Sequence, residues 1–347
     1  MKIAVVGAGA VGGYVGVKLS LAGERVTFVA RGANLEAIRS RGVKLVLGDG
    51  TELAARDVQA TADYAGAGPQ DLVILAVKAH QLETVANEVP KLFGPETCVV
   101  TMQNGIPYWY FHKHGGPLEG RCVTTVDPTG VNLLRIPPQR VIGCVVYPAS
   151  VLAAPGVIRH IEGDRFPVGE LDGSASTRVQ AVSACFIRAG FQAPVLDNIR
   201  AEIWLKLWGN LTFNPISALT RATLVEICQF PATRELAARM MAEAQAVAHK
   251  LGISFRVPIE RRIAGAERVG KHKTSMLQDL EAGRMMETDA LLGSVLELAR
   301  MTETPVPTLE AVYALTKLLG RPAEADGQSS LVSAAAAATT AAPARRS

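Results

Sequence analysis

The sequence predicts an α/β protein, with a parallel sheet covered by helices in the N-terminal part and mostly α-helix in the C-terminal part. Three observations predict this class. Short apolar runs alternate with helical segments from residue 2 to about residue 100, a glycine-rich turn follows the first run, and helical periodicity dominates from residue 174 onward. A chain of 347 residues is long enough for two packed domains, and we expect two.

The N-terminal part consists of repeated strand–helix–strand units. The strand candidates are KIAVV, RVTFV, DLVILAV and TCVVTM, and a helix is expected after the first strand, up to Ala22. Continuous apolar strands are typical of a parallel sheet that is buried on both faces. The pieces VIGCVVYP, GVIRHI and RFPVG lie between Val141 and Gly169 and are separated by turns. We expect them to be antiparallel strands that close the same sheet.

The C-terminal part contains long segments with an apolar period of 3.6 residues, such as TRVQAVSACFIRAG and TRELAARMMAEAQAVAHKLG. These segments predict helices bordered by Pro and Gly. We therefore place a nucleotide-binding domain at 1–172 and a helical substrate and catalytic domain at 173–322. Residues 323–347 are small and polar without an apolar period, which predicts a disordered, Ala-rich tail.

Composition excludes several classes of protein. Hydrophobic residues make up 48% and charged residues 20%, which is typical of a soluble globular chain. The net charge is only +4 and the basic residues are scattered, so we expect no nucleic-acid partner. No apolar segment reaches the roughly 18 residues of a membrane span, so we expect no membrane partner. Five separated cysteines without a CxxC pair indicate neither disulfides nor a metal site, which favours the cytoplasm.

A Rossmann-type dinucleotide site is predicted where the first strand turns into the first helix. The predicted cofactor-binding loop consists of Gly7, Ala8, Gly9, Ala10, Val11 and Gly12. In this GxGxxG pattern the first glycine allows a tight turn, the second lets the backbone approach the pyrophosphate, and the third lets helix and strand pack closely. The helix N-terminus then offers N–H groups to the phosphates. The alternative is a glycine-rich turn without a ligand.

Arg31 favours NADPH over NADH as the cofactor. It ends the second strand, about twenty residues past the last motif glycine, where an NAD site would normally carry an acid for the ribose 2′-hydroxyl. A guanidinium instead accepts a 2′-phosphate through charge-assisted hydrogen bonds. The alternative is an arginine that is merely solvated in a loop.

A polar stripe is predicted on the helical segment from Ile203 to Leu219. Lys206, Asn210 and Asn214 recur at intervals of four, so they share one side of the helix among mostly apolar neighbours. A lysine and two carboxamides facing a dry interior need partners, and a polar ligand is one such partner. The alternative is the ordinary wet face of an amphipathic helix.

Two further polar residues follow strands of the predicted sheet. Lys78 ends DLVILAVK, and Asn104 lies in the turn QNG after TCVVTM. Ligands of open α/β sheets bind at the carboxyl ends of the strands, so both residues are candidates for the site. The alternative for Asn104 is turn chemistry with Gly105.

Taken together, these blocks resemble the ketopantoate reductase (2-dehydropantoate 2-reductase) family over nearly the whole chain. The resemblance rests on the glycine loop with Arg31, on AVKAHQ, on QNGI, on NIRAEIWLKLWGNLTFNPISALT and on SMLQDLEAGRMMETDALLG. It implies a Rossmann domain and a helical domain with the active site in the cleft between them. It also implies reduction of ketopantoate to (R)-pantoate by NADPH, a step of pantothenate biosynthesis.

The resemblance implies roles for individual residues. Lys206 would be the general acid for the ketone oxygen, and Glu287 would accept a hydrogen bond from the terminal hydroxyl of the substrate. Asn104 is expected to hydrogen-bond the substrate as a catalytic residue and also to bind the cofactor, and Lys78, the other active-site lysine, is expected to bind the cofactor. Asn210, Asn214 and Ser275 would bind the substrate. Read without the family, Ser275 is equally a helix cap and Glu287 a surface charge. His80 and His160 have no visible partner.

Two departures from the family leave alternatives open. The segment around Glu287 reads RMMETDALLG, whereas the family pattern is closer to RxTEIDxxNG, so the alternative is an NADPH-dependent reductase of another small 2-oxo acid. The stretch from Tyr108 to Pro148 is longer than usual and is expected to form an extra lobe over the cleft. A different class of function is a non-catalytic NADPH sensor. Apolar outer faces of the helical domain leave a homodimer open.

Overall fold

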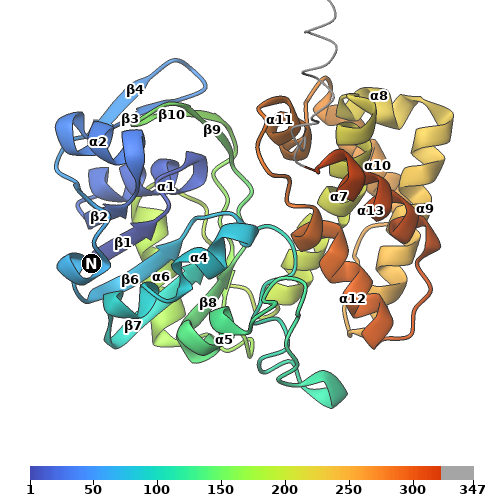
Figure 1. The fold of residues 1–347 in the computed structure, drawn as a ribbon, viewed down its shortest axis with the longest axis horizontal. Coiled ribbons are helices and arrows are strands. Elements are labelled where there is room, and N and C mark those ends of the chain that lie inside the picture. Colours follow the sequence, from blue (N-terminus) through green and yellow to red (C-terminus); the bar gives the residue numbers. More distant parts are fainter. Residues whose placement is uncertain (322–347) are drawn as a thin grey trace, which may run out of the picture.

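The computed structural model describes residues 1–321 as a sheet-containing part followed by a helical part (Figure 1), which confirms the predicted α/β class. Residues 322–347, which include the predicted tail at 323–347, lie outside the described residues. The predicted domain boundaries stay predictions. Within residues 1–321, no helix has both the length and the apolar character needed to span a membrane.

The strands are β1 (Lys2–Val6), β2 (Arg25–Val29), β3 (Val43–Val46), β4 (Glu52–Ala55), β5 (Gln59–Thr61), β6 (Gln70–Leu75), β7 (Phe93–Thr101), β8 (Val141–Cys144), β9 (Ala149–Ala154), β10 (Val157–Glu162) and β11 (Val168–Gly169). The helices are α1 (Ala10–Leu21), α2 (Gly32–Arg41), α3 (Tyr64–Ala67), α4 (Leu82–Ala86), α5 (Val131–Arg135), α6 (Thr177–Arg188), α7 (Ile199–Thr220), α8 (Leu224–Gln229), α9 (Pro231–Lys250), α10 (Ile259–Val269), α11 (Ser275–Glu281), α12 (Ser294–Met301) and α13 (Pro307–Leu319). A 3-10 turn, η1 (Ala79–Gln81), and a π-helical segment, η5 (Asp289–Gly293), lie near the site described below.

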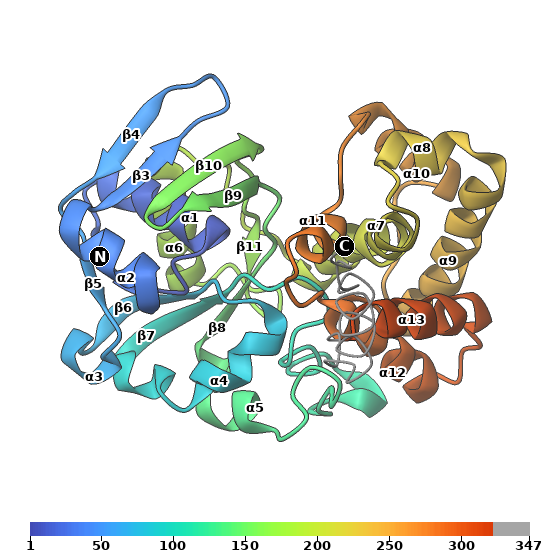
Figure 2. The ribbon, with the colours of Figure 1, turned by 45° about the horizontal axis from the view of Figure 1, so that its top comes forward.

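The main sheet has seven strands in the order β11-β8-β7-β6-β1-β2-β5, and all neighbouring pairs except β11 with β8 are parallel. Its strands are apolar on both faces. In β1, Ile3 and Val5 belong to the core shared with α1 and α6, whereas Ala4 and Val6 belong to the core shared with α3 and α4. Alternate residues of a strand point to opposite faces, so the continuous apolar run is explained by burial on both sides. Figure 2 shows α1 and α6 on one side of the sheet and α4 and α5 on the other.

A second sheet corrects the prediction for residues 141–169. Only β8 and β11 join the main sheet, and β8 is parallel to β7 rather than antiparallel. The segment GVIRHI, in β10, instead pairs with β3 and β9 in a separate four-stranded sheet, β4-β3-β10-β9. This sheet rests on α1, where a Cβ on Gly13 would lie 2.5 Å from the side chain of Ile158. His160 has a partner there, because its ring stacks on Tyr14 with a centroid distance of 4.4 Å.

The long stretch from Tyr108 to Pro148 joins the two parts instead of forming a lobe, so that prediction is wrong for most of its length. Trp109 is buried and its indole N–H donates to Thr101 of β7. Further along, the buried carboxylate of Glu297 in α12 accepts hydrogen bonds from the backbone of Thr124 and Thr125 at 2.8 and 2.7 Å. Burial alone would raise the pKa of Glu297, but these hydrogen bonds lower it.

Helix α7 begins against the sheet and continues into the helical core. Ile199 and Ile203 pack in the core on the α4 face of the sheet, and Trp208 is fully buried in the core of the helical part. At its start, the guanidinium of Arg200 donates to the carbonyls of Tyr110 at 2.8 Å and Leu171 at 2.6 Å, and also to that of His112. One buried cation thus satisfies three loop carbonyls around the point where the chain passes between the two parts.

We expect Arg200→Met to lower the free energy of unfolding by about 3 kcal/mol, because three carbonyls, two of them in buried hydrogen bonds, lose a charged donor. The matched control is Arg239→Met, since Arg239 is exposed and its ion pair with Glu235 spans 3.9 Å. The control should change stability by less than about 0.5 kcal/mol. Urea unfolding of both variants measures the difference, and equal effects would contradict the role of Arg200.

Candidate active site

The glycine loop has the backbone geometry that its sequence predicts. Gly7 has a φ of +98°, and its N–H donates to the carbonyl of Val29 at 3.0 Å. A Cβ on Gly12 would lie 2.0 Å from the carbonyl oxygen of Gly7, so this position excludes every side chain. A Cβ on Gly9 would meet nothing within 4 Å. The space beside Gly9 is therefore open for a ligand to approach the backbone.

The start of α1 is suited to an anion. Gly9 is its N-cap residue, no side chain caps the helix, and no acidic residue lies in its first turn. The first N–H groups of a helix lack intrahelical acceptors, and the helix dipole places partial positive charge there. A phosphate group of a dinucleotide fits this end of the helix.

A cavity of about 470 Å³ lies in front of the glycine loop, lined in part by Gly7, Gly9, Arg31, Asn34 and Tyr64. The side chain of Asn34 bridges the loop to the second sheet, donating to the carbonyl of Ala8 at 2.6 Å and accepting from the N–H of Gly156 at 2.8 Å. Arg31 is exposed, and its guanidinium makes no hydrogen bond or ion pair within residues 1–321. It is free to bind a ligand in this cavity.

A chain of three polar side chains crosses the boundary between the two parts. Lys206 of α7 donates to Asn104 Oδ1 at 2.7 Å, and Asn104 Nδ2 donates to Glu287 at 3.2 Å. The ammonium of Lys206 also donates to the carbonyl of Val146. The cation and the carboxylate together determine which way the amide of Asn104 points. An ammonium has three N–H donors, so one donor of Lys206 remains for a ligand.

Burial tunes the acidity of Lys206. Removal from water lowers its pKa to about 8, although the charge of Glu287 acts in the opposite direction. An amine with this pKa is still mostly protonated at neutral pH, yet it gives up its proton more readily than an exposed lysine. Lys206 can therefore act as an acid in a reaction near pH 7.

The turn after β7 places Asn104 against the helical part. Gly105 has a φ of +87°, and a Cβ there would lie 2.0 Å from the carbonyl oxygen of Ala290 in η5. Only glycine allows this approach, which brings Asn104 to Glu287. The neighbouring Gln103 donates to the carbonyls of Leu75 and Val77, each at 2.9 Å, and so holds the end of β6 beside the turn.

A second cavity, of about 550 Å³, lies between the sheet part and the helical part. Lys206, Asn210 and Asn214 all line it, as their spacing on one helix predicts, together with Val11, Asn104 and Ser275. Asn214 donates to Ser275 at 3.4 Å. Ser275 is the first residue of α11 and not its cap, because the side chain of Thr274 accepts from the N–H of Leu277. The hydroxyl of Ser275 therefore has no capping role and instead accepts from the amide of Asn214.

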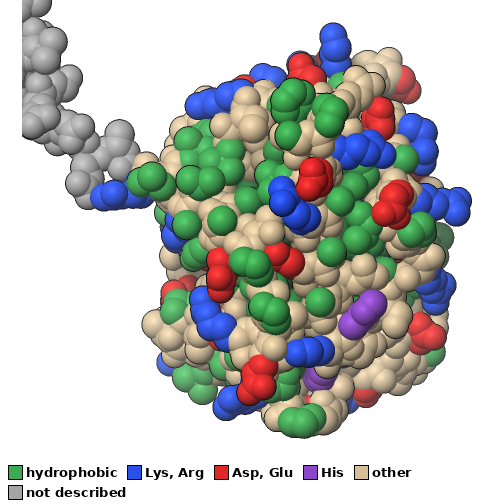
Figure 3. Space-filling model, turned by 90° about the vertical axis from the view of Figure 1, so that its right-hand side faces the viewer, with side chains coloured by type: hydrophobic (Ala, Val, Ile, Leu, Met, Phe, Trp, Pro, Cys, Tyr) green, Lys and Arg blue, Asp and Glu red, His purple; other side chains and the backbone are tan. Residues whose placement is uncertain are grey.

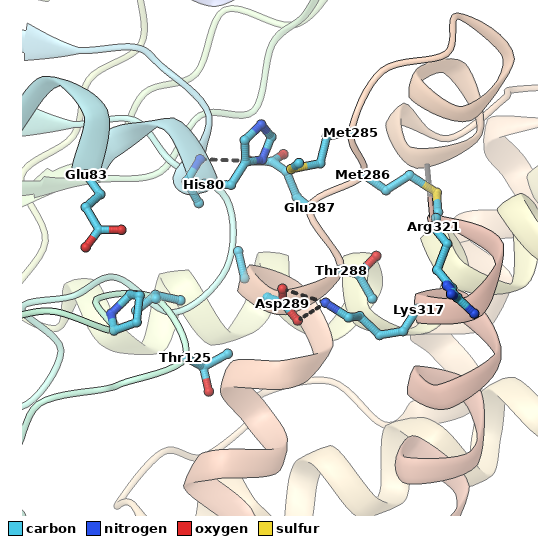
Figure 4. A pocket seen from close by; sticks show the side chains of 15 residues that line it. His80, Glu83, Thr125, Met285, Met286, Glu287, Thr288, Asp289, Lys317 and Arg321 are labelled. Atoms are coloured by element: carbon cyan, nitrogen blue, oxygen red, sulfur yellow. Dashed lines mark hydrogen bonds and ion pairs between the residues drawn. The ribbon is translucent and has the colours of Figure 1, made fainter. Parts of the chain in front are cut away.

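Glu287 faces a third cavity, of about 400 Å³, shown in Figure 4. His80, Glu287, Asp289 and Lys317 line this space, and Asp289 pairs with Lys317 at 2.9 Å. Glu287 is not a free surface charge, since it also accepts from the N–H of Ala79 at 3.2 Å. Burial lowers the pKa of His80, although the charge of Glu287 acts in the opposite direction. The predicted substrate residues therefore line two different cavities, and the hydrogen bond between Asn104 and Glu287 links a residue of one to a residue of the other.

Lys78 has a partner that sequence reasoning missed. Its ammonium pairs with Asp279 of α11, whose other oxygen accepts from Arg284 at 2.9 Å. Asp279 lies in SMLQDLEAG, where two acids on a short helix carry no signal of such a contact. In this arrangement Lys78 ties the end of β6 to the helical part, and its contact with a cofactor stays a prediction.

Comparisons with known proteins agree with the two-part fold. A family model described as ketopantoate reductase PanE/ApbA matches residues 3–173, and its C-terminal counterpart matches residues 198–320. A 2-dehydropantoate 2-reductase from Mesorhizobium japonicum is 54% identical over 92% of this chain and 98% of its own length.

Solved structures give the same result. A crystal structure assigned as a ketopantoate reductase from Ralstonia solanacearum has a TM-score of 0.88 at 43% identity, covering 92% of this chain and 97% of the other. The 2-dehydropantoate 2-reductase of Methylococcus capsulatus has a TM-score of 0.76 at 28% identity, covering 92% and 96%. The geometry of the glycine loop is thus found in a chain whose relatives are reductases that use a nicotinamide cofactor.

Two glycine variants separate cofactor binding from folding. We expect Gly9→Ala to leave the stability of the free protein nearly unchanged, because its Cβ meets open space, and to weaken cofactor binding about tenfold or more. Gly12→Ala should lower the stability of the free protein by about 1–3 kcal/mol, because its Cβ would overlap the carbonyl of Gly7. Thermal unfolding with and without the cofactor measures both effects. Equal behaviour of the two variants would contradict the assignment of the loop.

Proposed function

This chain belongs to the ketopantoate reductase family, and from that membership we propose that it reduces 2-dehydropantoate (ketopantoate) to (R)-pantoate with NADPH, for pantothenate biosynthesis. The single observation that carries the proposal is Lys206. It is a partly buried ammonium with a lowered pKa and one unused donor, and it lies in the cleft that the nicotinamide end of the cofactor would reach.

The path of the cofactor follows from the two cavities at the glycine loop. One is lined by Gly7, Gly9 and Arg31, and the other by Val11 and Lys206. The first turn of α1 lies between them, so the pyrophosphate would bind at this helix end, with the adenosine on the Arg31 side. The nicotinamide would then lie beside Asn104 and Lys206. When bound there, NADPH supplies the hydride that adds to the ketone carbon of the substrate.

The residues of the chain supply the proton and the orientation. Lys206 would donate a hydrogen bond to the ketone oxygen and transfer a proton to it as the carbon accepts the hydride. Asn104 holds the ammonium in place through the 2.7 Å hydrogen bond. Asn210 and Asn214 would hydrogen-bond the substrate from the same face of α7, with Ser275 opposite. Glu287 would accept from the terminal hydroxyl of ketopantoate, on the far side of Asn104.

The direct test uses purified protein with NADPH and ketopantoate, followed by the loss of NADPH absorbance. Turnover that yields (R)-pantoate supports the proposal, and absence of turnover rejects ketopantoate as the substrate.

One observation favours a second candidate, the reduction of another small 2-oxo acid. Met285 and Met286 line the cavity at Glu287 (Figure 4), so the acid has apolar neighbours. A panel of branched 2-oxo acids separates the two candidates by kcat/KM.

The finer assignments of partner and location remain proposals. The helical part exposes Phe230, Leu315 and Leu318, each at least 55% accessible, which would suit a homodimer. On the face shown in Figure 3, however, apolar side chains are mixed with charged ones. Measurement of the molar mass in solution decides between monomer and dimer. The cytoplasmic location and the lack of a nucleic-acid partner stay predictions of the sequence.

We predict that Lys206→Met lowers kcat by about 10²–10⁴-fold while the Kd for NADPH changes little, because a proton donor is lost and the glycine loop is not altered. In the wild type, the ammonium form is the active one for reduction. The kcat/KM should therefore be constant below about pH 7 and fall tenfold per pH unit above the Lys206 pKa of about 8. Unchanged turnover by Lys206→Met would reject Lys206 as the general acid, whereas NADPH binding by the wild type without turnover of any 2-oxo acid would favour a non-catalytic sensor.

We predict that Arg31→Ala raises the Kd for NADPH by about 10–100-fold and leaves the Kd for NADH nearly unchanged, because only NADPH carries the 2′-phosphate. Arg39→Ala on α2, the helix that begins directly after Arg31, is the matched control, since the Nε of Arg39 donates to the carbonyl of Ala60. Fluorescence titration with the two cofactors measures the ratio. An equal loss for both cofactors would show that Arg31 does not select the phosphate.

A further inference from the structure

Arg262 is a guanidinium without a counter-ion in the wall of the cavity that holds Lys206. It lies on α10 and lines the 550 Å³ cavity. Its Nε is buried and has no hydrogen-bond partner, and the guanidinium forms no ion pair with any residue of 1–321. Burial lowers its pKa, which Tyr147 only partly offsets. A half-buried guanidinium whose buried Nε has no hydrogen-bond partner is costly, so its place in a ligand cavity indicates that a ligand is its partner.

A glycine of α7 makes room for this guanidinium. A Cβ on Gly209 would lie 2.4 Å from Nη2 of Arg262, so the absence of a side chain there makes room for the guanidinium. Gly209 follows Lys206 by three residues, which is about 4.5 Å along the axis of a helix. The two cations therefore lie less than one turn apart along α7. Asn210, the next residue, lines the same cavity.

The two helices present matching faces to this cavity. From α7 these are Lys206, Gly209, Asn210, Phe213 and Asn214, and from α10 Arg262, Gly265, Ala266 and Val269. Both sets follow the spacing of one helical face, so Arg262 lies on the face of α10 that lines the cavity. Glu162 is the one carboxylate among the lining residues, and it is exposed and not paired with Arg262.

We propose that Arg262 binds the carboxylate of the 2-oxo acid and is the residue that selects acids over neutral ketones. The proposal rests on the proposed function and names the part of the substrate that α10 recognises. In a 2-oxo acid the carboxylate is bonded directly to the ketone carbon, so its receptor must lie next to the proton donor of the ketone. Lys206 of α7 and Arg262 of α10 meet this requirement, because the guanidinium of Arg262 lies beside Gly209, three residues after Lys206. A guanidinium binds a carboxylate through two parallel N–H···O hydrogen bonds.

The test compares Arg262→Met with the matched control Arg261→Met, whose arginine is exposed and does not line this cavity. We expect Arg262→Met to raise the KM for ketopantoate about 30-fold with kcat changed less than threefold, because the charge-assisted contact is made in both ground and transition states. Arg262→Lys, which keeps the charge but loses the fork, should give an intermediate KM. Arg261→Met should behave as the wild type.

A binding probe separates this proposal from the proposed function. Oxamate carries a carboxylate beside a carbonyl but has no reducible ketone, and its methyl ester is the neutral counterpart. In the NADPH complex, Arg262→Met should weaken oxamate binding about 30-fold and leave the ester unchanged. If the wild type does not reduce ketopantoate, the proposed function fails, while oxamate binding still tests Arg262.

A second variant, Gly209→Ala, still tests the proposal if Arg262→Met does not fold. Gly209→Ala keeps the charge and favours the helix, but its Cβ displaces the guanidinium, so the KM for ketopantoate and the Kd for oxamate should both rise severalfold. NADPH binding should stay normal in every variant. Wild-type affinity for oxamate in both Arg262→Met and Gly209→Ala would overturn the proposal. Equal losses for oxamate and its ester in Arg262→Met would overturn it too, because they would show a role in packing alone.

Discussion

The hydrogen-bonded chain from Lys206 through Asn104 to Glu287 is the contact on which the arrangement of the site depends. It joins α7, the carboxyl end of β7 and the segment before η5, which come from both parts of the molecule. A buried ammonium is stable only with acceptors, and Asn104 and Val146 provide them from the sheet side. The proton donor is thereby directed toward the edge of the sheet where a dinucleotide would end.

The rest of the fold keeps these three elements in register. Gly105 lets the turn touch η5, and Gln103 holds the adjacent end of β6. Arg200 secures the start of α7 to the loop carbonyls beneath it, and Glu297 secures the long loop to α12. Each contact is at least partly buried and involves a charge or a backbone group, so each is costly to break. The site therefore lies at a well-packed joint between two cores.

Local features of the site could be predicted from the sequence. The glycine loop depends on a few consecutive residues, and the stripe of Lys206, Asn210 and Asn214 depends only on the helical repeat. The second sheet could not be predicted, because it pairs β3 with β10 across more than a hundred residues of chain. Such pairings are settled by tertiary packing and leave little local pattern.

The same reason explains which site residues were missed. Asp279 is one of two acids on a short helix, and only the fold brings it to Lys78. Arg262 lies in IERRIAGAERV, where Arg261 and Arg268 are exposed. From the sequence, Arg262 would therefore be predicted to lie on the solvent-exposed face of the helix as well. The helical period does place it on the face of Ala266 and Val269, but the periodicity alone does not say that this face lines a cavity.

A crystal structure of the dead-end complex with NADP⁺ and ketopantoate would test the central claim most directly. The quantity to measure is the distance from Lys206 Nζ to the ketone oxygen. We expect about 3 Å, with the ketone carbon facing C4 of the nicotinamide and Asn104 still bound to Lys206. A complex in which the acid occupies only the cavity beside His80 and Asp289, with Lys206 still bound to Asn104 and Val146 alone, would contradict the claim.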